Sequence, residues 1–97
     1  MTKIIEVKGS VQDWVAQNSA QIHLDVLESC ENGLANGEKE IDVVILKTSK
    51  GITRFVLNTT GKITRALNLS LVSFVENEEY ELAARARDCI SGWNEKE

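Results

Sequence analysis

The sequence predicts an α+β fold in which a small antiparallel sheet carries its helices on one face. Two observations support this class. Short runs rich in Val and Ile predict strands, whereas two longer segments repeat apolar residues with the 3.6-residue period of an amphipathic helix. The expected strands lie near residues 3–8, 41–48 and 52–58, and the expected helices lie near residues 10–32 and 77–94. At 97 residues the chain is long enough for one modest core, so we expect residues 1–97 to form a single domain.

The first helix is expected to begin at Ser10, directly after the strand KIIEVKG. Ser10 can accept a hydrogen bond from the backbone N–H of Asp13, in a variant of the capping box. One stripe of apolar residues follows at helical spacing: Val11, Val15, Ile22, Val26 and Cys30. Two Asn-Gly pairs, Asn32-Gly33 and Asn36-Gly37, come next, and either can supply the left-handed residue that ends the helix.

IDVVILKTSKGITRFVLN, residues 41–58, predicts a β-hairpin, because two β-rich runs flank the short turn TSKG. The first run is apolar on both faces, with Val43 and Ile45 on one face and Val44 and Leu46 on the other. A strand of this kind is typical of the centre of a sheet.

Residues 61–75 are compatible with either of two structures. Apolar residues at helical spacing predict a helix that Thr60 could cap: Ile63, Ala66, Leu67, Leu71 and Phe74. Within residues 66–75, however, Leu67, Leu69 and Leu71 alternate with Asn68 and Ser70, which favours a third antiparallel strand. The sequence leaves both interpretations open.

The C-terminal segment predicts a helix that starts at Asn77, with Glu78 and Glu79 in the first turn, where the helix dipole favours negative charge. Glu81 and Arg85 are four residues apart and are expected to pair on the exposed side. The apolar arc of this helix is wider than one sheet face can cover: Tyr80, Leu82, Ala83, Ala84, Ala86, Cys89, Ile90 and Trp93. A second surface, from the same chain or from a partner, is therefore expected against it.

Arg87 falls inside this apolar arc. A buried unpaired charge is costly, so its side chain must either extend out to solvent or meet a carboxylate. The second case would be a specific ion pair across an interface.

The segment from Glu76 to Ile90 resembles the second half of the UVR motif, a helical hairpin of excision-repair nuclease subunits B and C. In that family an acidic turn precedes the pattern Phe-Glu-x-Ala-Ala-x-x-Arg-Asp-x-Ile. Here the matching residues are Tyr80, Glu81, Ala83, Ala84, Arg87, Asp88 and Ile90, after the acidic turn Glu76-Asn77-Glu78-Glu79. The first arm matches at Leu67 and Leu71, but Phe74 stands where the family prefers Ala. The resemblance implies a protein-docking element without catalytic function.

If residues 66–75 form a strand, the order of a helix, three strands and an Ala-rich helix resembles a double-stranded-RNA-binding domain. Such domains place lysines at the start of the last helix to meet phosphates. This chain has Glu76, Glu78 and Glu79 there, which would repel a nucleic acid backbone. The net charge of −4 argues in the same direction.

The sequence offers no pattern for catalysis, for a cofactor or for a metal. His23 is the single histidine, and it does not combine with Cys30 and Cys89 at the spacing of a zinc site. TTGKIT lacks the first glycine of a phosphate-binding loop. We therefore expect a protein without enzymatic activity. The chain contains no apolar run long enough to span a membrane, and from its first residues we expect no signal peptide. Its two cysteines are typical of the reducing cytosol.

The sequence thus predicts a small cytosolic protein–protein interaction module, which docks through its C-terminal helix on a second copy or on another protein. The candidate binding residues are Tyr80, Ala83, Ala84, Arg87, Asp88, Ile90 and Trp93. Two alternatives stay open. One is an acidic decoy that occupies a nucleic-acid-binding surface of another protein through Glu76, Glu78, Glu79 and Glu81, and the other is direct contact with nucleic acid.

Overall fold

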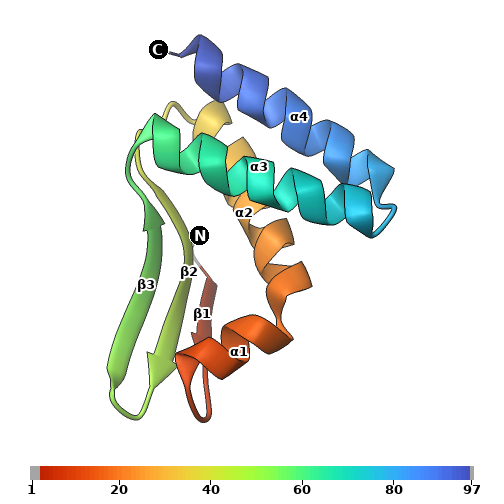
Figure 1. Cartoon of the computed structure of the whole chain (residues 1–97). Helices are drawn as coiled ribbons and strands as arrows, with labels where there is room; N and C mark the ends of the chain where they lie inside the picture. The colour runs from red at the N-terminus through yellow and green to blue at the C-terminus, as the bar shows by residue number, and fades with distance from the viewer. Residues whose placement is uncertain (1–2, 97) are drawn as a thin grey trace.

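The computed structural model describes residues 3–96, in which three strands and four helices form the expected α+β fold (Figure 1). In chain order the elements are β1 (Lys3–Glu6), α1 (Val11–Gln17), α2 (Ser19–Ala35), β2 (Ile41–Thr48), β3 (Gly51–Leu57), α3 (Thr60–Glu76) and α4 (Tyr80–Glu95). Within the described residues, no helix is both long enough and apolar enough to cross a lipid bilayer.

The sheet has the strand order β1-β2-β3, so β2 is central, as its two apolar faces predict. The hairpin of β2 and β3 is antiparallel, and Thr48 pairs with Gly51 at its turn. The prediction of a fully antiparallel sheet is wrong, because β1 runs parallel to β2, with Ile4 opposite Ile45. The cause is the connection: α1 and α2 carry the chain back to the end of the sheet at which β1 began, which gives a parallel neighbour.

All four helices lie on one side of the sheet, as expected (Figure 1). Helix α2 packs on the inner face of β2 and also contacts α3 and α4. The outer face carries no helix, and Ile4 and Ile52 on its two edge strands are 66% and 67% exposed. The N-terminal elements and the C-terminal hairpin therefore meet through α2.

The expected single helix over residues 10–32 is two helices. Ser10 caps α1 as predicted, since its Oγ accepts a hydrogen bond from the backbone N–H of Asp13 at 3.1 Å. Asn18 then leaves the helical conformation (φ −120°, ψ 25°), and its Nδ2 donates to the carbonyl oxygen of Trp14 at 2.9 Å. Helix α2 continues to Ala35 and ends at Asn36 and Gly37, where Gly37 has φ of 69°. Gly33 stays inside the helix.

Residues 66–75 belong to helix α3, so the expectation of a third antiparallel strand is wrong. Thr59, one residue earlier than expected, caps the helix and accepts from the N–H of Lys62 at 3.1 Å. The buried residues follow helical spacing: Ile63, Leu67, Ser70 and Phe74. Burial of this stripe against α2 and α4 outweighs the weak helix propensity of Asn, Ser and Val. The element order of a double-stranded-RNA-binding domain is therefore not present in residues 3–96.

Gly33 allows α2 and the start of β2 to approach closely. A Cβ added at Gly33 would overlap Cδ1 of Ile41, whose side chain is 1% exposed and has no free space to move into. Gly61, in the first turn of α3, is a matched contrast, because its Cβ would meet Thr59 Oγ1 at 4.0 Å.

We therefore predict that Gly33→Ala lowers the free energy of unfolding by about 1–3 kcal/mol, because overpacking outweighs the gain in helix propensity. Gly61→Ala, the control, should be neutral or slightly stabilising. Urea unfolding of the two variants measures both effects. Equal stability of the variants would contradict the close packing of α2 on β2.

Candidate interaction surface on the helical hairpin

Helices α3 and α4 form an antiparallel hairpin (Figure 1). The chain reverses at Glu78, which adopts a left-handed conformation with φ of 59°. The N–H of Glu79 donates to the carbonyl oxygen of Phe74 at 2.8 Å, and the N–H of Glu78 donates to that of Val75 at 3.1 Å. These two bonds form a Schellman motif. Asn77 therefore ends α3, and the prediction that it caps the last helix is wrong.

Helix α2 supports both helices of the hairpin from behind. On α3, Ser70 Oγ lies 2.8 Å from Nδ1 of His23, and Phe74 packs edge-on against the same ring at 6.4 Å between centroids. On α4, Arg85 forms a bidentate ion pair with Glu31, with distances of 2.6 and 3.2 Å. The expected pair of Arg85 with Glu81 is thus replaced by a contact between helices. The partner of Arg85 therefore depends on how α4 packs on α2, which the spacing of residues within one helix does not show.

Trp93 and Ala83 face inward, so they are core residues and offer no surface to a partner. They are 2% and 7% exposed, and Ala86 and Cys89 are buried with them. Trp93 Nε1 donates to the carbonyl oxygen of Cys30 at 3.0 Å, and Lys96 Nζ covers the ring at 4.5 Å from its centroid. The chain itself therefore covers much of the apolar arc of α4. Two of the seven candidate binding residues can meet a partner only if the core opens.

The other candidate residues divide between the surface and the edge of the core. Tyr80 is 63% exposed, and Arg87 and Asp88 are exposed beside it. Ala84 and Ile90 are half-buried. Arg87 extends into solvent and bonds its neighbour Asp88 at 3.2 Å, so its charge needs no partner from another molecule.

Three apolar side chains on the outer side of α3 complete this surface. Leu69, Val72 and Val75 are 62%, 54% and 48% exposed. Helical periodicity did not single them out as binding residues, because α3 carries two apolar stripes and the buried stripe accounts for the helical period. The signal in the sequence is the spacing Arg65, Leu69, Val72 and Glu76, a second stripe bounded by charges.

The exposed residues of α3 and α4 point to the same side of the hairpin. Both helices turn one side to α2, through Ser70 and Phe74 on α3 and through Arg85 on α4. Leu69 and Val72 on α3, and Tyr80 and Arg87 on α4, lie roughly 100–200° around their helices from those contacts. In Figure 1, α3 lies in front of α2, and no described segment covers the side of the hairpin turned to the viewer. The hairpin face is defined here by its residues: Leu69, Val72, Val75, Tyr80 and Arg87.

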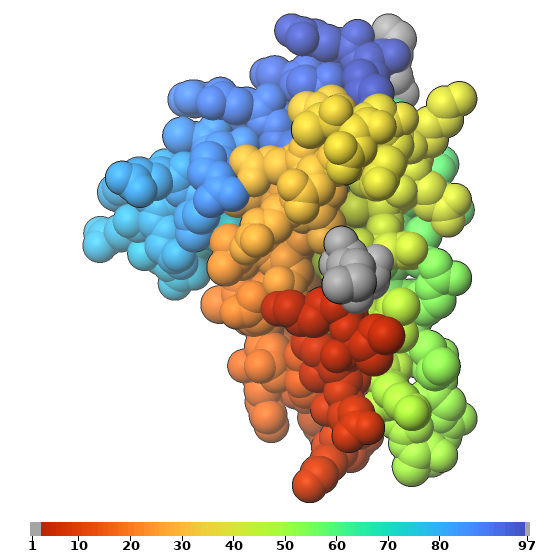
Figure 2. All heavy atoms as spheres, turned by 180° about the vertical axis from the view of Figure 1, so that it is seen from behind, coloured from red at the N-terminus to blue at the C-terminus, as the bar shows by residue number. Residues whose placement is uncertain are grey.

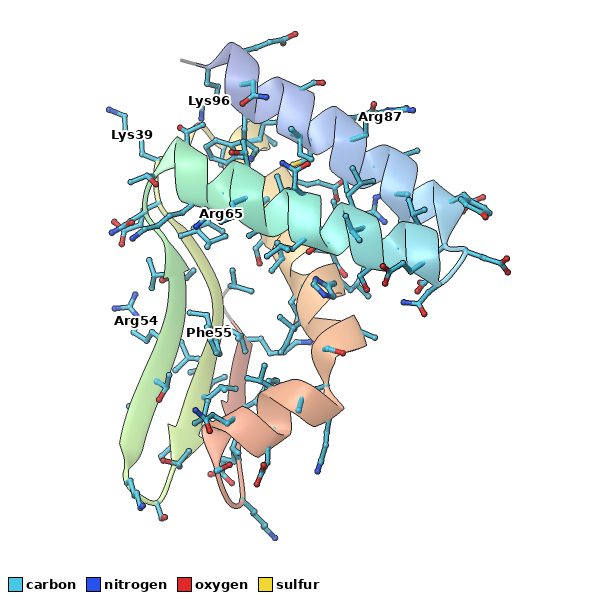
Figure 3. The ribbon with its side chains drawn as sticks, viewed as in Figure 1. Lys39, Arg54, Phe55, Arg65, Arg87 and Lys96 are labelled. Carbon is cyan, nitrogen blue, oxygen red and sulfur yellow. The ribbon has the colours of Figure 1, made fainter. Side chains whose placement is uncertain are left out.

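Two of the cations around α3 and along β3 are engaged in contacts within the chain. Figure 3 shows Lys39 and Lys96 near the start of α3, and Arg54 on β3. Arg54 is paired with Asp42 at 2.9 Å, and Lys96 covers Trp93 and donates to the carbonyl oxygen of Glu38 at 3.2 Å. These internal bonds reduce the charge that the surface offers to a nucleic acid.

The hollow beside the β2–β3 turn does not gather reactive groups. This hollow, of about 570 Å³, lies between the start of α1 and the turn of the β2–β3 hairpin, and Lys50 is its single ionisable lining residue. Figure 2 shows the molecule from the opposite side, where α2 lies between β1 and the helical hairpin of α3 and α4. Within residues 3–96, no three His, Cys, Asp or Glu side chains come together in a way that could hold a metal ion.

The two thiols lie in the core, and the histidine is half-buried at its edge. Burial raises the pKa of Cys30 to about 12 and that of Cys89 to about 11, so both remain protonated at neutral pH. Both cysteines are free. Burial also lowers the pKa of His23 below its ordinary value of 6.5, so the ring is neutral where it meets Ser70. Thiols that stay protonated are poor nucleophiles and poor metal ligands.

Comparison of the chain with protein-family models, with curated proteins and with solved structures found no match. The function is therefore inferred from the geometry and chemistry of the chain itself.

We predict that Tyr80→Ala and Arg87→Glu change the free energy of unfolding by less than about 0.5 kcal/mol, because both side chains lie in solvent. Trp93→Ala should cost about 3–5 kcal/mol, because it leaves a cavity between α2 and α4. Thermal and urea unfolding separate the two groups. A large loss for Tyr80→Ala would place this ring in the core.

We also predict that stability falls with acid through His23. The unfolded chain binds a proton on this residue at a higher pH than the folded chain, so the contribution of the neutral ring is present above about pH 6.5 and is lost as the pH falls towards the lowered folded pKa. Urea unfolding between about pH 5 and pH 7 measures the slope. His23→Gln, the control, should flatten the curve in this window, and an unchanged slope would exclude His23 as its cause.

Proposed function

We propose that this protein is a non-enzymatic protein–protein interaction module that docks through the hairpin face. The observation that carries the proposal is the exposure of Leu69, Val72 and Tyr80, each more than half exposed, on two helices held rigidly from behind. Contiguous exposed apolar surface is uncommon on soluble proteins and marks interaction sites.

The scaffold makes this surface suited to binding. The Schellman motif fixes the turn, and the pair of Arg85 with Glu31 fixes α4 on α2. A surface that is already ordered loses little conformational entropy when a partner binds. Tyr80 and Arg87 are of the residue types that often dominate interface energy, and both are free to contact a partner without disturbing the core.

The proposal keeps the docking role expected for the C-terminal helix. It places the contact on the exposed hairpin face and not on the buried side of α4. Ala83 and Trp93 support the surface from inside, whereas Leu69, Val72 and Val75 of α3 supply most of its apolar area. A helical hairpin that docks on proteins is also what the resemblance to the UVR motif implies. The two free buried thiols support a place in the reducing cytosol.

The acidic turn at the end of the hairpin favours a second candidate, a decoy for a nucleic-acid-binding surface. Glu76, Glu78, Glu79 and Glu81 are all exposed and form no ion pair with other described residues. A basic partner bound through these acids would dissociate steeply with added salt, whereas docking on the apolar hairpin face would not.

The test compares two substitutions of equal chemistry on different faces. Leu69→Glu introduces a charge in the hairpin face, and Ile52→Glu, the control, introduces the same charge on the bare face of the sheet. The two side chains are similarly exposed, Leu69 at 62% and Ile52 at 67%. Immobilised protein is used to capture partners at low and at high salt. We expect Leu69→Glu to reduce capture at least tenfold and Ile52→Glu to leave it unchanged.

The opposite pattern, loss with Ile52→Glu alone, would place the interface on the sheet and exclude the hairpin face. Capture that disappears at high salt but survives Leu69→Glu would favour the acidic decoy.

A further inference from the structure

We propose that the hairpin face binds a second copy of this chain, with the two α3 helices antiparallel across a two-fold axis. This inference rests on the proposed function, because it names the partner of the same surface. It is carried by the order of charged and apolar residues along the exposed side of α3.

The exposed side of α3 carries a stripe with the residue spacing of a helix–helix seam. Arg65, Leu69, Val72 and Glu76 are separated by four, three and four residues, which places them within about 60° around the helix. The two central residues are apolar and largely exposed. One end of the stripe is positive and the other is negative, so the stripe has a direction.

An antiparallel pair of such stripes is complementary to itself. The middle of the stripe lies between residues 70 and 71, and a two-fold axis there places Arg65 opposite Glu76 of the second copy and Leu69 opposite Val72 of the second copy. The ion pair and the apolar contact then each form twice. A parallel pair would place Arg65 against Arg65 and Glu76 against Glu76, which is unfavourable. The charges therefore select the antiparallel arrangement.

Arg65 and Glu76 are available for this pairing. Within residues 3–96 neither takes part in an ion pair, whereas Arg54, Arg85 and Arg87 are all paired within the chain. Arg65 and Glu76 lie at opposite ends of one helix, about 16 Å apart, so they cannot neutralise each other. Their charges are left for a neighbouring molecule.

The bare face of the sheet is a weaker candidate for self-association. Ile4 and Ile52 lie on opposite edge strands, and the cross-strand row that begins at Ile4 ends at Arg54. Arg54 is already paired with Asp42. The unpaired charges of this face, Glu6 on β1 and Lys47 on β2, are direct cross-strand neighbours, so they compensate each other locally and set no register with a second copy.

The α3 side of the hairpin is accessible to another helix. Figure 1 shows no described segment in front of α3. Val75 and Tyr80 lie beside the stripe, towards α4, and would extend the contact. One helix from each copy buries less than the roughly 1,200 Å² at which standard interfaces begin, so the association is weak and depends on concentration.

The experiment is a set of charge reversals, measured by sedimentation equilibrium over a range of protein concentration. Arg65→Glu and Glu76→Arg should each weaken self-association about tenfold or more, because each converts both ion pairs into like-charge contacts. The double variant Arg65→Glu/Glu76→Arg should restore wild-type association, because both pairs form again with their signs exchanged. The control Lys39→Glu has the same change of net charge as Arg65→Glu and should have no effect.

A mixture of the two single variants provides a further test of the ion pairs, which does not depend on the homodimer of either variant. In a mixed pair each new charge meets its opposite, so an equimolar mixture of Arg65→Glu and Glu76→Arg should associate more strongly than either variant alone. All these substitutions are at exposed positions. Circular dichroism confirms that the variants are folded before their masses are compared.

A monomeric wild type at every concentration would overturn the inference, and so would a dimer whose affinity the charge reversals do not change. A double variant that fails to regain association would also exclude the antiparallel pairing. These failures differ from a failure of the proposed function. If the protein is monomeric but Leu69→Glu still abolishes capture of a different protein, the hairpin face remains an interaction surface and only its partner changes.

Discussion

The position of α2 between the sheet and the C-terminal hairpin is the constraint on which the rest of the structure depends. Its inner side packs on β2, and its other sides contact α3 and α4. Gly33 permits the approach to Ile41, and the carbonyl oxygen of Cys30 accepts the indole N–H of Trp93 at 3.0 Å. Without these contacts, a three-stranded sheet with a four-residue edge strand would have too little apolar surface to fold by itself.

The same position of α2 explains why the hairpin presents one exposed side. Because α2 covers the back of both helices, it buries Ser70 and Phe74 and pairs Glu31 with Arg85. The sides that remain carry Leu69, Val72 and Tyr80. These contacts accompany one rotation of each helix about its axis, and this rotation decides which apolar residues become core and which become surface. The exposed apolar side of the hairpin is thus a consequence of how the core is built.

The two apolar stripes of α3 also explain the ambiguity of residues 61–75. A helix that is apolar on opposite sides has a weak period, and alternation within LNLSLV imitates a strand. Burial of Ile63, Leu67 and Phe74 against other elements decides for the helix. Within residues 3–96 the second stripe stays exposed, which is why we propose that it contacts another molecule.

The sequence by itself determined the local elements. The cap at Ser10, the β2–β3 hairpin, the central position of β2 and the C-terminal helix are all contained in short-range patterns, and the structure agrees with them. Two helix boundaries were predicted wrongly: Asn18 interrupts the first helix, and Asn77 ends α3 instead of starting α4. Both are short polar residues whose side chains bond the backbone of the preceding turn.

Only the tertiary structure decided which residues of the hairpin can meet a partner. Helical spacing placed Tyr80, Ala83 and Trp93 in one apolar arc, but it does not show which part of this arc faces α2. The chain buries Trp93 and Ala83 and leaves Tyr80 in solvent, because α2 and α3 approach α4 from two particular sides. The parallel pairing of β1 and the ion pair of Arg85 with Glu31 depend in the same way on residues far apart in the sequence. Periodicity shows which residues share a side of a helix, whereas long-range packing determines what that side faces.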